Sequence, residues 1–172
     1  MLELLKNTEF DDVYSIMEDS FPADERRPYN EQKMLLNKDN YEVYVIKDTS
    51  CRISAFIAVW SFNDFIFIEH FAVDSSFRNS GIGSSVLNDI KNKYNKIICL
   101  EVEPPESEIT RRRVGFYERN GFYLNHYAYA QPPISKGKNP VPLMIMTTDK
   151  EISEDEFIDI KESIYKTVYN VV

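Results

Sequence analysis

The sequence predicts an α/β (α+β) fold in which helices flank a single mixed β-sheet. Strand-like segments alternate with segments whose apolar residues recur at helical spacing, in the order β-α-α-β-β-β-α-β-α-β-β-α. The chain has 172 residues, of which 43% are hydrophobic, and this length suits one domain with a substantial core. We therefore expect a single domain over residues 1–172, with an amphipathic helix within residues 149–172.

Residues 1–73 predict the first half of this order. A short strand over 2–7 is followed by Thr8, a typical helix N-cap, and a second short helix is expected to start at Asn30. Residues 41–60 read as two strands joined by the turn residues 47–50, and a third strand follows over about 65–73.

The second half begins with a helix whose apolar face includes Val86 and Ile90, followed by a buried strand over 96–102. Thr110 is expected to cap a short helix that ends at Gly121. Two strands follow, over 122–130 and 141–149.

The last predicted helix starts with a capping box formed by Ser153 and Glu156. Its apolar face packs on the sheet of its own chain or, alternatively, contacts a second copy in a homodimer. The residues of this face are Phe157, Ile160, Ile164 and Val168.

Charge and cysteine content narrow the function classes. The net charge of −8 disfavours nucleic-acid binding, which needs clustered Lys and Arg, and is compatible with a cationic acceptor such as an amine. No apolar run approaches the roughly 20 residues that span a bilayer, and the N-terminus lacks the pattern of a signal peptide. Cys51 and Cys99 are the only cysteines, which argues against a zinc site or a disulfide framework and favours a cytoplasmic protein.

An Arg-x-x-Gly-x-Gly loop lies between the third long strand and the helix that follows it. The start of a helix carries unpaired N–H groups, and glycines allow the backbone to approach an anion closely. Arg78 adds a cation beside Gly81 and Gly83. The spacing is neither that of a P-loop nor that of a dinucleotide fingerprint. Taken alone, the loop is either an ordinary turn or a phosphate-binding site.

The segment IEHFAVDSSFRNSGIGSSVL, residues 68–87, resembles the acetyl-CoA-binding motif of the GNAT superfamily of N-acetyltransferases. LEVEPPE (100–106) and FYERNGF (116–122) resemble the next strand and helix of that family. The resemblance implies a mostly antiparallel central sheet in the GNAT acyl-CoA N-acyltransferase fold, here with an added C-terminal helix. It also implies acetyl-CoA as co-substrate and no metal.

The same resemblance implies how acetyl-CoA is held. In this family the strand that ends the motif diverges from the next strand, and the pantetheine arm pairs with its backbone, here Phe71, Ala72 and Val73. Glycines are needed in the loop that binds the pyrophosphate because a Cβ would push the phosphates away. The pyrophosphate is expected on backbone amides of Arg78, Asn79, Ser80, Gly81, Ile82, Gly83 and Ser84.

The chemistry needs a base and an acid. An alkyl amine has a pKa of about 10 and must lose a proton before it attacks a thioester. By resemblance, Tyr117 is the acid that protonates the leaving thiolate, and Glu101 is the base. Glu69 is a rival base, because strand alternation predicts that it shares a face with Phe71 and Val73, whereas His70 has the opposite parity and is expected to be structural.

The acceptor side is less well defined by the sequence. Glu103 and Glu25 are candidates for binding a cationic substrate, and Arg26 or Arg27 for binding an anionic one, although each also suits a solvated loop. Arg113 replaces a small residue of the family pattern, which leaves the local cofactor contacts and an acidic substrate group open.

The leading hypothesis is N-acetylation of a small-molecule amine, favoured by the long loops 103–110 and 130–142, which narrow the groove. The alternatives are acetylation of a protein N-terminus or lysine, and a non-catalytic acyl-CoA sensor.

Overall fold

The computed structural model describes residues 1–171 and contains one seven-stranded sheet with the order β1-β2-β3-β4-β5-β7-β6. Only β4 and β5 are parallel, and every other neighbouring pair is antiparallel. The predicted mixed, mostly antiparallel sheet is confirmed. The strands are β1 (Glu3–Leu4), β2 (Tyr41–Lys47), β3 (Ile53–Ser61), β4 (Phe65–Val73), β5 (Ile97–Val102), β6 (Phe122–Gln131) and β7 (Val141–Thr148).

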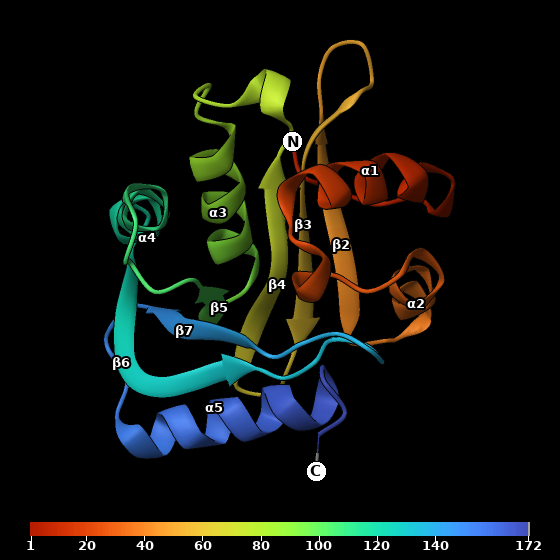
Figure 1. Cartoon of the computed structure of the whole chain (residues 1–172). Helices are drawn as coiled ribbons and strands as arrows, with labels where there is room; N and C mark the ends of the chain where they lie inside the picture. The colour runs from red at the N-terminus through yellow and green to blue at the C-terminus, as the bar shows by residue number, and fades with distance from the viewer. Residues whose placement is uncertain (172) are drawn as a thin grey trace.

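Helices cover both faces of the sheet (Figure 1). One apolar cluster joins α1 (Phe10–Ser20) and α5 (Glu154–Thr167) to the sheet, with α2 (Tyr29–Met34) packed beside α1. A second cluster lies beneath α3 (Ile82–Lys93) and α4 (Glu108–Arg119). The first cluster is aromatic-rich and contains Trp60, which is fully buried.

The C-terminal helix packs on its own chain. Phe157, Ile160 and Ile164 of α5 are buried in the first cluster together with Val168. The capping box predicted from Ser153 and Glu156 is present. The apolar face of α5 is therefore not free to contact a second copy.

Three of the helices start at residues other than the ones predicted, because their N-caps differ from the expected ones. The cap of α4 is Ser107, not Thr110, because Thr110 occupies the third helical position and completes a capping box with Ser107. The expected caps Thr8 and Asn30 are also wrong. Thr8 lies in a 3₁₀ turn over Asn7–Glu9, before α1 begins at Phe10, and Asn30 lies inside α2, which begins at Tyr29 directly after Pro28. Gly121 follows α4 with φ of +82°, as expected for a residue that ends a helix.

The parallel strands β4 and β5 separate halfway along their length. Their pairing covers only Phe65–Ile68 against Ile97–Leu100. Beyond Ile68, within the described residues, β4 remains paired with β3 on one edge only, while β5 remains paired with β7. One edge of the β4 backbone from Glu69 to Val73 is therefore left free inside the molecule.

A β-bulge lies at the point of divergence. Ala58 of β3 pairs with His70 and Val59 pairs with Ile68, so Glu69 is an extra residue in β4. A bulge breaks the alternation of side chains. Glu69 and His70 consequently both contact the α1 side of the sheet, whereas Phe71 packs with the α3 and α4 cluster.

The expectation that Glu69 shares a face with Phe71 and Val73 is therefore wrong. His70 lies on the same side as Glu69 rather than opposite to it, although it does lie opposite to Phe71 and Val73 as expected.

Candidate active site

One cavity of about 770 Å³ opens where β4 and β5 diverge, and it brings the predicted site residues together. Its lining runs from the loop before α3, along the free edge of β4, to the end of β5 and the middle of α4. The lining includes Glu25, Glu69, Phe71, Ala72, Val73, Arg78, Asn79, Ser80, Gly81, Ile82, Gly83, Ser84, Glu101, Glu103 and Tyr117.

The loop from Arg78 to Ser84 lines this cavity. Asn79 and Gly81 both have positive φ, and Gly81 is the N-cap of α3 with φ of +82°. Because the cap has no side chain, the first N–H groups of α3 lack a capping acceptor. Arg78 Nε donates to the Val73 carbonyl at 3.2 Å, which ties the loop to the end of β4. These features fit a bound phosphate.

The two glycines of this loop are needed for different reasons. Gly81 adopts a left-handed conformation that L side chains rarely take, although a Cβ there would meet no atom within 4 Å. At Gly83, a Cβ would lie 3.1 Å from Phe116 Cζ and 3.7 Å from Phe71 Cζ. Gly83 thus allows α3 to approach the aromatic rings that form the cavity wall.

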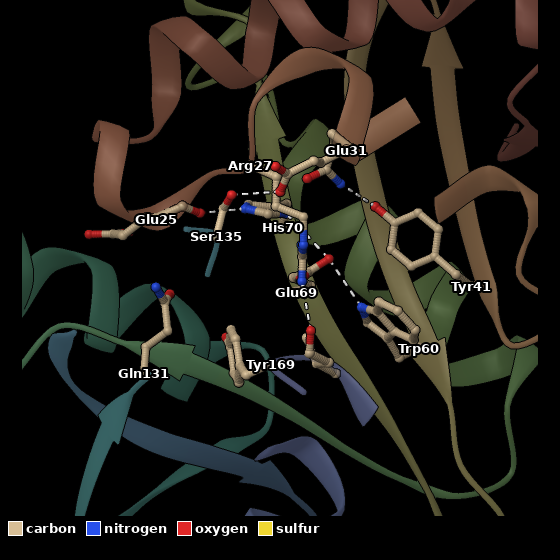
Figure 2. Close-up of polar contacts among 12 residues, drawn as sticks. Glu25, Arg27, Glu31, Tyr41, Trp60, Glu69, His70, Gln131, Ser135 and Tyr169 are labelled. Carbon is tan, nitrogen blue, oxygen red and sulfur yellow. Dashed lines mark hydrogen bonds and ion pairs between the residues drawn. The ribbon is translucent and has the colours of Figure 1, made fainter. Parts of the chain in front are cut away.

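Glu69 is buried in an ion pair. Arg27 Nη1 donates to Glu69 Oε1 at 2.5 Å, and Trp60 Nε1 donates to Oε2 at 3.0 Å (Figure 2). The side chains of Arg27 and Glu69 are 6% and 1% exposed. Burial alone would raise the pKa of Glu69, but the charge of Arg27 and the two hydrogen bonds outweigh it and leave the pKa below its usual range. A carboxylate held in this way is a poor proton acceptor.

His70 links β4 to the segment before α2. Its Nε2 donates to the Glu25 carbonyl at 2.7 Å, and its Nδ1 lies 3.7 Å from Glu69 Oε2 (Figure 2). Burial lowers the pKa of His70, so the ring is neutral at pH 7. This arrangement agrees with the structural role expected for His70.

Glu101 has a different environment from Glu69. It is mostly buried, and its carboxylate accepts hydrogen bonds from the hydroxyls of Tyr129 and Tyr169, the latter at 2.8–2.9 Å from the two oxygens. Burial raises the pKa of Glu101 to about 7, against the opposing effect of the two tyrosine hydroxyls. A carboxyl group with this pKa exchanges protons readily at neutral pH.

Tyr117 reaches the cavity from α4. Its ring packs edge-on against Phe116 and Phe122, and burial raises the pKa of its hydroxyl to about 12. Tyr117 therefore stays protonated at neutral pH, and its hydroxyl makes no hydrogen bond to other residues in the range 1–171. It is available as a proton donor to a bound molecule.

Charges on the acceptor side of the cavity are partly paired. Glu103 forms an ion pair with Arg113, so the unusual cation of α4 already has a partner. Burial and the charge of Glu103 raise the pKa of Glu25, against the effect of Arg113. Arg26 pairs with Glu18 near the surface, and Arg27 pairs with Glu69 in the interior. The expectation that Arg27 receives a substrate anion or lies in a solvated loop is therefore wrong.

The long loop between β6 and β7 is hydrogen-bonded to the segment before α2 and to α2 itself. Gln131 Nε2 donates to the Asp24 carbonyl at 2.9 Å. Asn139 donates from its backbone N and from Nδ2 to the Asp24 carboxylate, both at 3.1 Å. Ser135 Oγ donates to Glu31 at 2.6 Å. These contacts hold the loop beside the segment that contains Glu25, and Gln131 and Glu25 both line the cavity.

Sequence reasoning missed Arg27, Tyr129 and Tyr169 as partners of the two glutamates. For Arg27 the sequence did contain a signal. A charged residue such as Glu69 in an apolar strand needs a buried partner, and the loop 21–27 contains two arginines. For Tyr129 there was none, because residues 122–130 contain three tyrosines and nothing local marks the one that contacts Glu101. Tyr169 lies 68 positions from Glu101, and no local pattern connects the two.

Within residues 1–171 no group of three or more His, Cys, Asp or Glu side chains is arranged to hold a metal ion. In the same range, no helix has the length and apolar character needed to cross a membrane.

Several solved structures that share this fold are described as acetyltransferases. A putative acetyltransferase of the GNAT family from Bacteroides thetaiotaomicron is 28% identical, with a TM-score of 0.88 over 100% of this chain and 99% of the other. The ribosomal-protein-S18-alanine N-acetyltransferase of Escherichia coli is 15% identical, with a TM-score of 0.64 over 90% and 96%. An aminoglycoside 6'-N-acetyltransferase complexed with coenzyme A is 13% identical, with a TM-score of 0.63 over 86% and 96%.

Comparison with curated protein sequences gives no match. The model of the acetyltransferase (GNAT) domain, however, matches residues 39–124, which is half of the chain and includes the glycine loop, β5 and α4. The chain therefore belongs to the GNAT family of acetyltransferases.

Proposed function

We propose that this acetyltransferase transfers the acetyl group of acetyl-CoA to the primary amine of a small molecule by direct attack. The observation that carries the proposal is the gap between β4 and β5, where one cavity reaches both Tyr117 and Glu101. The different pKa values of these two side chains support a base and an acid at separate positions in the cavity. Glu101 has a pKa of about 7 and Tyr117 one of about 12.

The free edge of β4 supports binding of the pantetheine arm. Backbone groups of Phe71, Ala72 and Val73 lie on the cavity, and β4 has no strand partner there on the β5 side among the described residues. The uncapped start of α3 supports binding of the pyrophosphate. Together they orient the thioester toward the gap.

Glu101 accepts the proton of the incoming ammonium group, directly or through water, and Tyr117 donates a proton to the departing thiolate sulfur. Glu69 is assigned to structure, because its charge is already neutralised by Arg27 and its pKa is low. The choice between the two glutamates thus rests on their different partners.

The acceptor is proposed to be a small cation. Glu25 lines the cavity, and its side chain forms no ion pair within residues 1–171. The loop between β6 and β7 is hydrogen-bonded to Asp24, next to Glu25, and a loop in this position favours a small molecule over a peptide. Glu103 is a weaker candidate for binding the amine because its carboxylate already forms an ion pair with Arg113. The two cysteines, one buried and one exposed and both unpaired, are consistent with a cytoplasmic location.

The direct test is product detection by mass spectrometry after incubation with acetyl-CoA and a metabolite extract, with a parallel panel of amines and peptides. Acetylated small amines are the expected products. Acetylation confined to peptide N-termini or lysines would contradict the acceptor class. Calorimetric binding of acetyl-CoA without any acetylated product would instead indicate a sensor.

Gly83→Leu is expected to weaken CoA binding at least about tenfold, measured by calorimetry. The new side chain would meet Phe116 and Phe71 and displace the start of α3 from the phosphate position. Ser85→Leu is the matched control, because Ser85 lies two positions further along the same helix and is exposed. Equal affinities of the two variants would show that the loop does not hold CoA.

Tyr117→Phe is expected to lower kcat about 100-fold while the affinity for acetyl-CoA stays close to that of the unmodified enzyme. The ring and its aromatic contacts remain, and only the proton donor is lost. Single-turnover kinetics with a fixed amine measures the effect. Unchanged turnover would remove Tyr117 from the mechanism.

A further inference from the structure

The chain beyond α5 turns back into the catalytic side of the molecule. Val168 and Tyr169 are 3% and 6% exposed, although they lie near the C-terminus. The Val168 N–H donates to the Ile164 carbonyl at 2.8 Å, and the Val171 N–H donates to the Tyr165 carbonyl at 2.9 Å. Residues 168–171, here called the C-terminal segment, are therefore fixed to the last turns of α5.

This segment contacts Glu101 directly. The Tyr169 hydroxyl lies 2.9 Å from Glu101 Oε1 and 2.8 Å from Oε2, so its proton is shared by the whole carboxylate. Tyr129 of β6 donates to Oε1 from a separate strand. Two hydroxyl donors on one carboxyl group restrict its rotation and favour its ionised form.

The same segment also contacts the ion pair of Glu69. Arg27 Nη2 donates to the Val168 carbonyl at 3.0 Å, while Nη1 of the same guanidinium binds Glu69 (Figure 2). Val168 thus contacts Arg27, the partner of Glu69, while the next residue, Tyr169, contacts Glu101.

We propose that the C-terminal segment completes the acceptor side of the active site and that Tyr169 is a positioning residue for Glu101. This inference rests on the proposed role of Glu101 as the base. Tyr169 holds the carboxylate toward the gap between β4 and β5 and stabilises its charge, so that an oxygen is presented to the amine.

Other groups also act on Glu101. Glu69 of β4 and Glu25 of the 3₁₀ turn Ala23–Glu25 disfavour its charge, and Tyr129 stabilises it. The thiol of Cys99 on the same strand and the hydroxyl of Tyr165 on α5 have their pKa raised by the charge of Glu101, after the larger effect of burial. Tyr169→Phe removes one hydroxyl that contacts Glu101 and leaves each of these other groups chemically unchanged, which makes the substitution selective.

The test compares Tyr169→Phe with Tyr165→Phe, using the pH dependence of kcat/KM for a fixed amine. Tyr165 is the matched control, because it lies on α5 and its hydroxyl donates to the Ala130 carbonyl rather than to Glu101. In Tyr169→Phe the acid limb is expected to move about one unit to higher pH, because the carboxylate loses one charge-assisted hydrogen bond. The KM for acetyl-CoA is expected to stay constant. Identical profiles for the two variants and the unmodified enzyme would overturn the proposal.

A second measurement does not depend on activity. Tyr169→Phe is expected to lower Tm more at pH 8 than at pH 5, because Glu101 is ionised only at the higher pH. This pH dependence is expected to vanish when the same change is made in Glu101→Gln. If it persists there, Tyr169 does not act through Glu101 and the proposal is wrong. If the protein acetylates no amine but Tyr169→Phe still lowers Tm in this pH-dependent way, the proposed function is wrong while the contact between Tyr169 and Glu101 stands.

Discussion

Glu101→Gln is expected to lower kcat about 1,000-fold, within the range that a positioned general base contributes. Glutamine keeps the shape of the side chain and retains an acceptor for Tyr129 and Tyr169, so the packing changes little. What it loses is a group that takes up a proton near pH 7. The kcat/KM of the unmodified enzyme should therefore rise with pH through about 7, and this limb should be absent in the variant.

The control for this prediction is Glu106→Gln, which removes an exposed carboxylate from the loop between β5 and α4. Its pH profile is expected to match that of the unmodified enzyme. A Glu101→Gln enzyme with normal turnover would exclude Glu101 as the base and return the role to another group.

The same substitution tests the environment of Glu101 through stability. Its folded pKa of about 7 lies above the value of 4.5 for an unperturbed glutamate, so the folded state holds its proton more tightly than the unfolded state. The free energy of unfolding therefore falls by about 3 kcal/mol as the pH rises from about 4.5 to 7. Urea unfolding of Glu101→Gln should lack this loss, which makes the variant more stable than the parent at pH 8.

Arg27→Met is expected to destabilise the protein by about 3–5 kcal/mol, the typical effect of breaking a buried ion pair. The substitution leaves the charge of Glu69 without its main partner and the Val168 carbonyl without its donor. Urea denaturation measures the change. Arg26→Met is the matched control, expected to cost less than about 1 kcal/mol, because Arg26 pairs with a half-exposed Glu18.

The double variant Arg27→Met with Glu69→Gln removes both charges, and glutamine still accepts the Trp60 N–H. It is expected to recover most of the lost stability, since no unpaired charge remains. It is also expected to keep kcat within about tenfold, since an accepting base contributes about 100-fold or more. A folded double variant without activity would instead identify Glu69 as the base.

Elements with local signals were predicted well from the sequence. The strands over 41–60 form from apolar and β-branched runs, and Gly121 ends α4 because only a residue tolerant of positive φ fits there. The loop before α3 was found because glycine, arginine and helix start are adjacent in sequence. The need for glycine at 83 was predicted from the bound phosphates and stays a prediction. The structure adds a contact that the sequence does not show, because a Cβ there would lie 3.1 Å from Phe116 Cζ of α4.

Predictions that depended on how two distant elements pack together were less successful, and two of them were wrong. The face of Glu69 was predicted from simple alternation, which fails because the bulge depends on how β3 pairs with β4. Arg27 was expected near solvent or substrate, yet it lies buried against a residue 42 positions away.

The sequence by itself determined the order of elements and the glycine loop, because these depend on short-range patterns of apolar residues and glycines, and its motifs carried the resemblance to the GNAT family. Only the tertiary structure decided the state of the two glutamates. Glu69 meets Arg27 and Glu101 meets Tyr169, which is 68 positions away, because the folded sheet and α5 bring them together. A pKa depends on burial and on neighbouring charges in space, so two similar residues on adjacent strands acquire different chemistry only after folding.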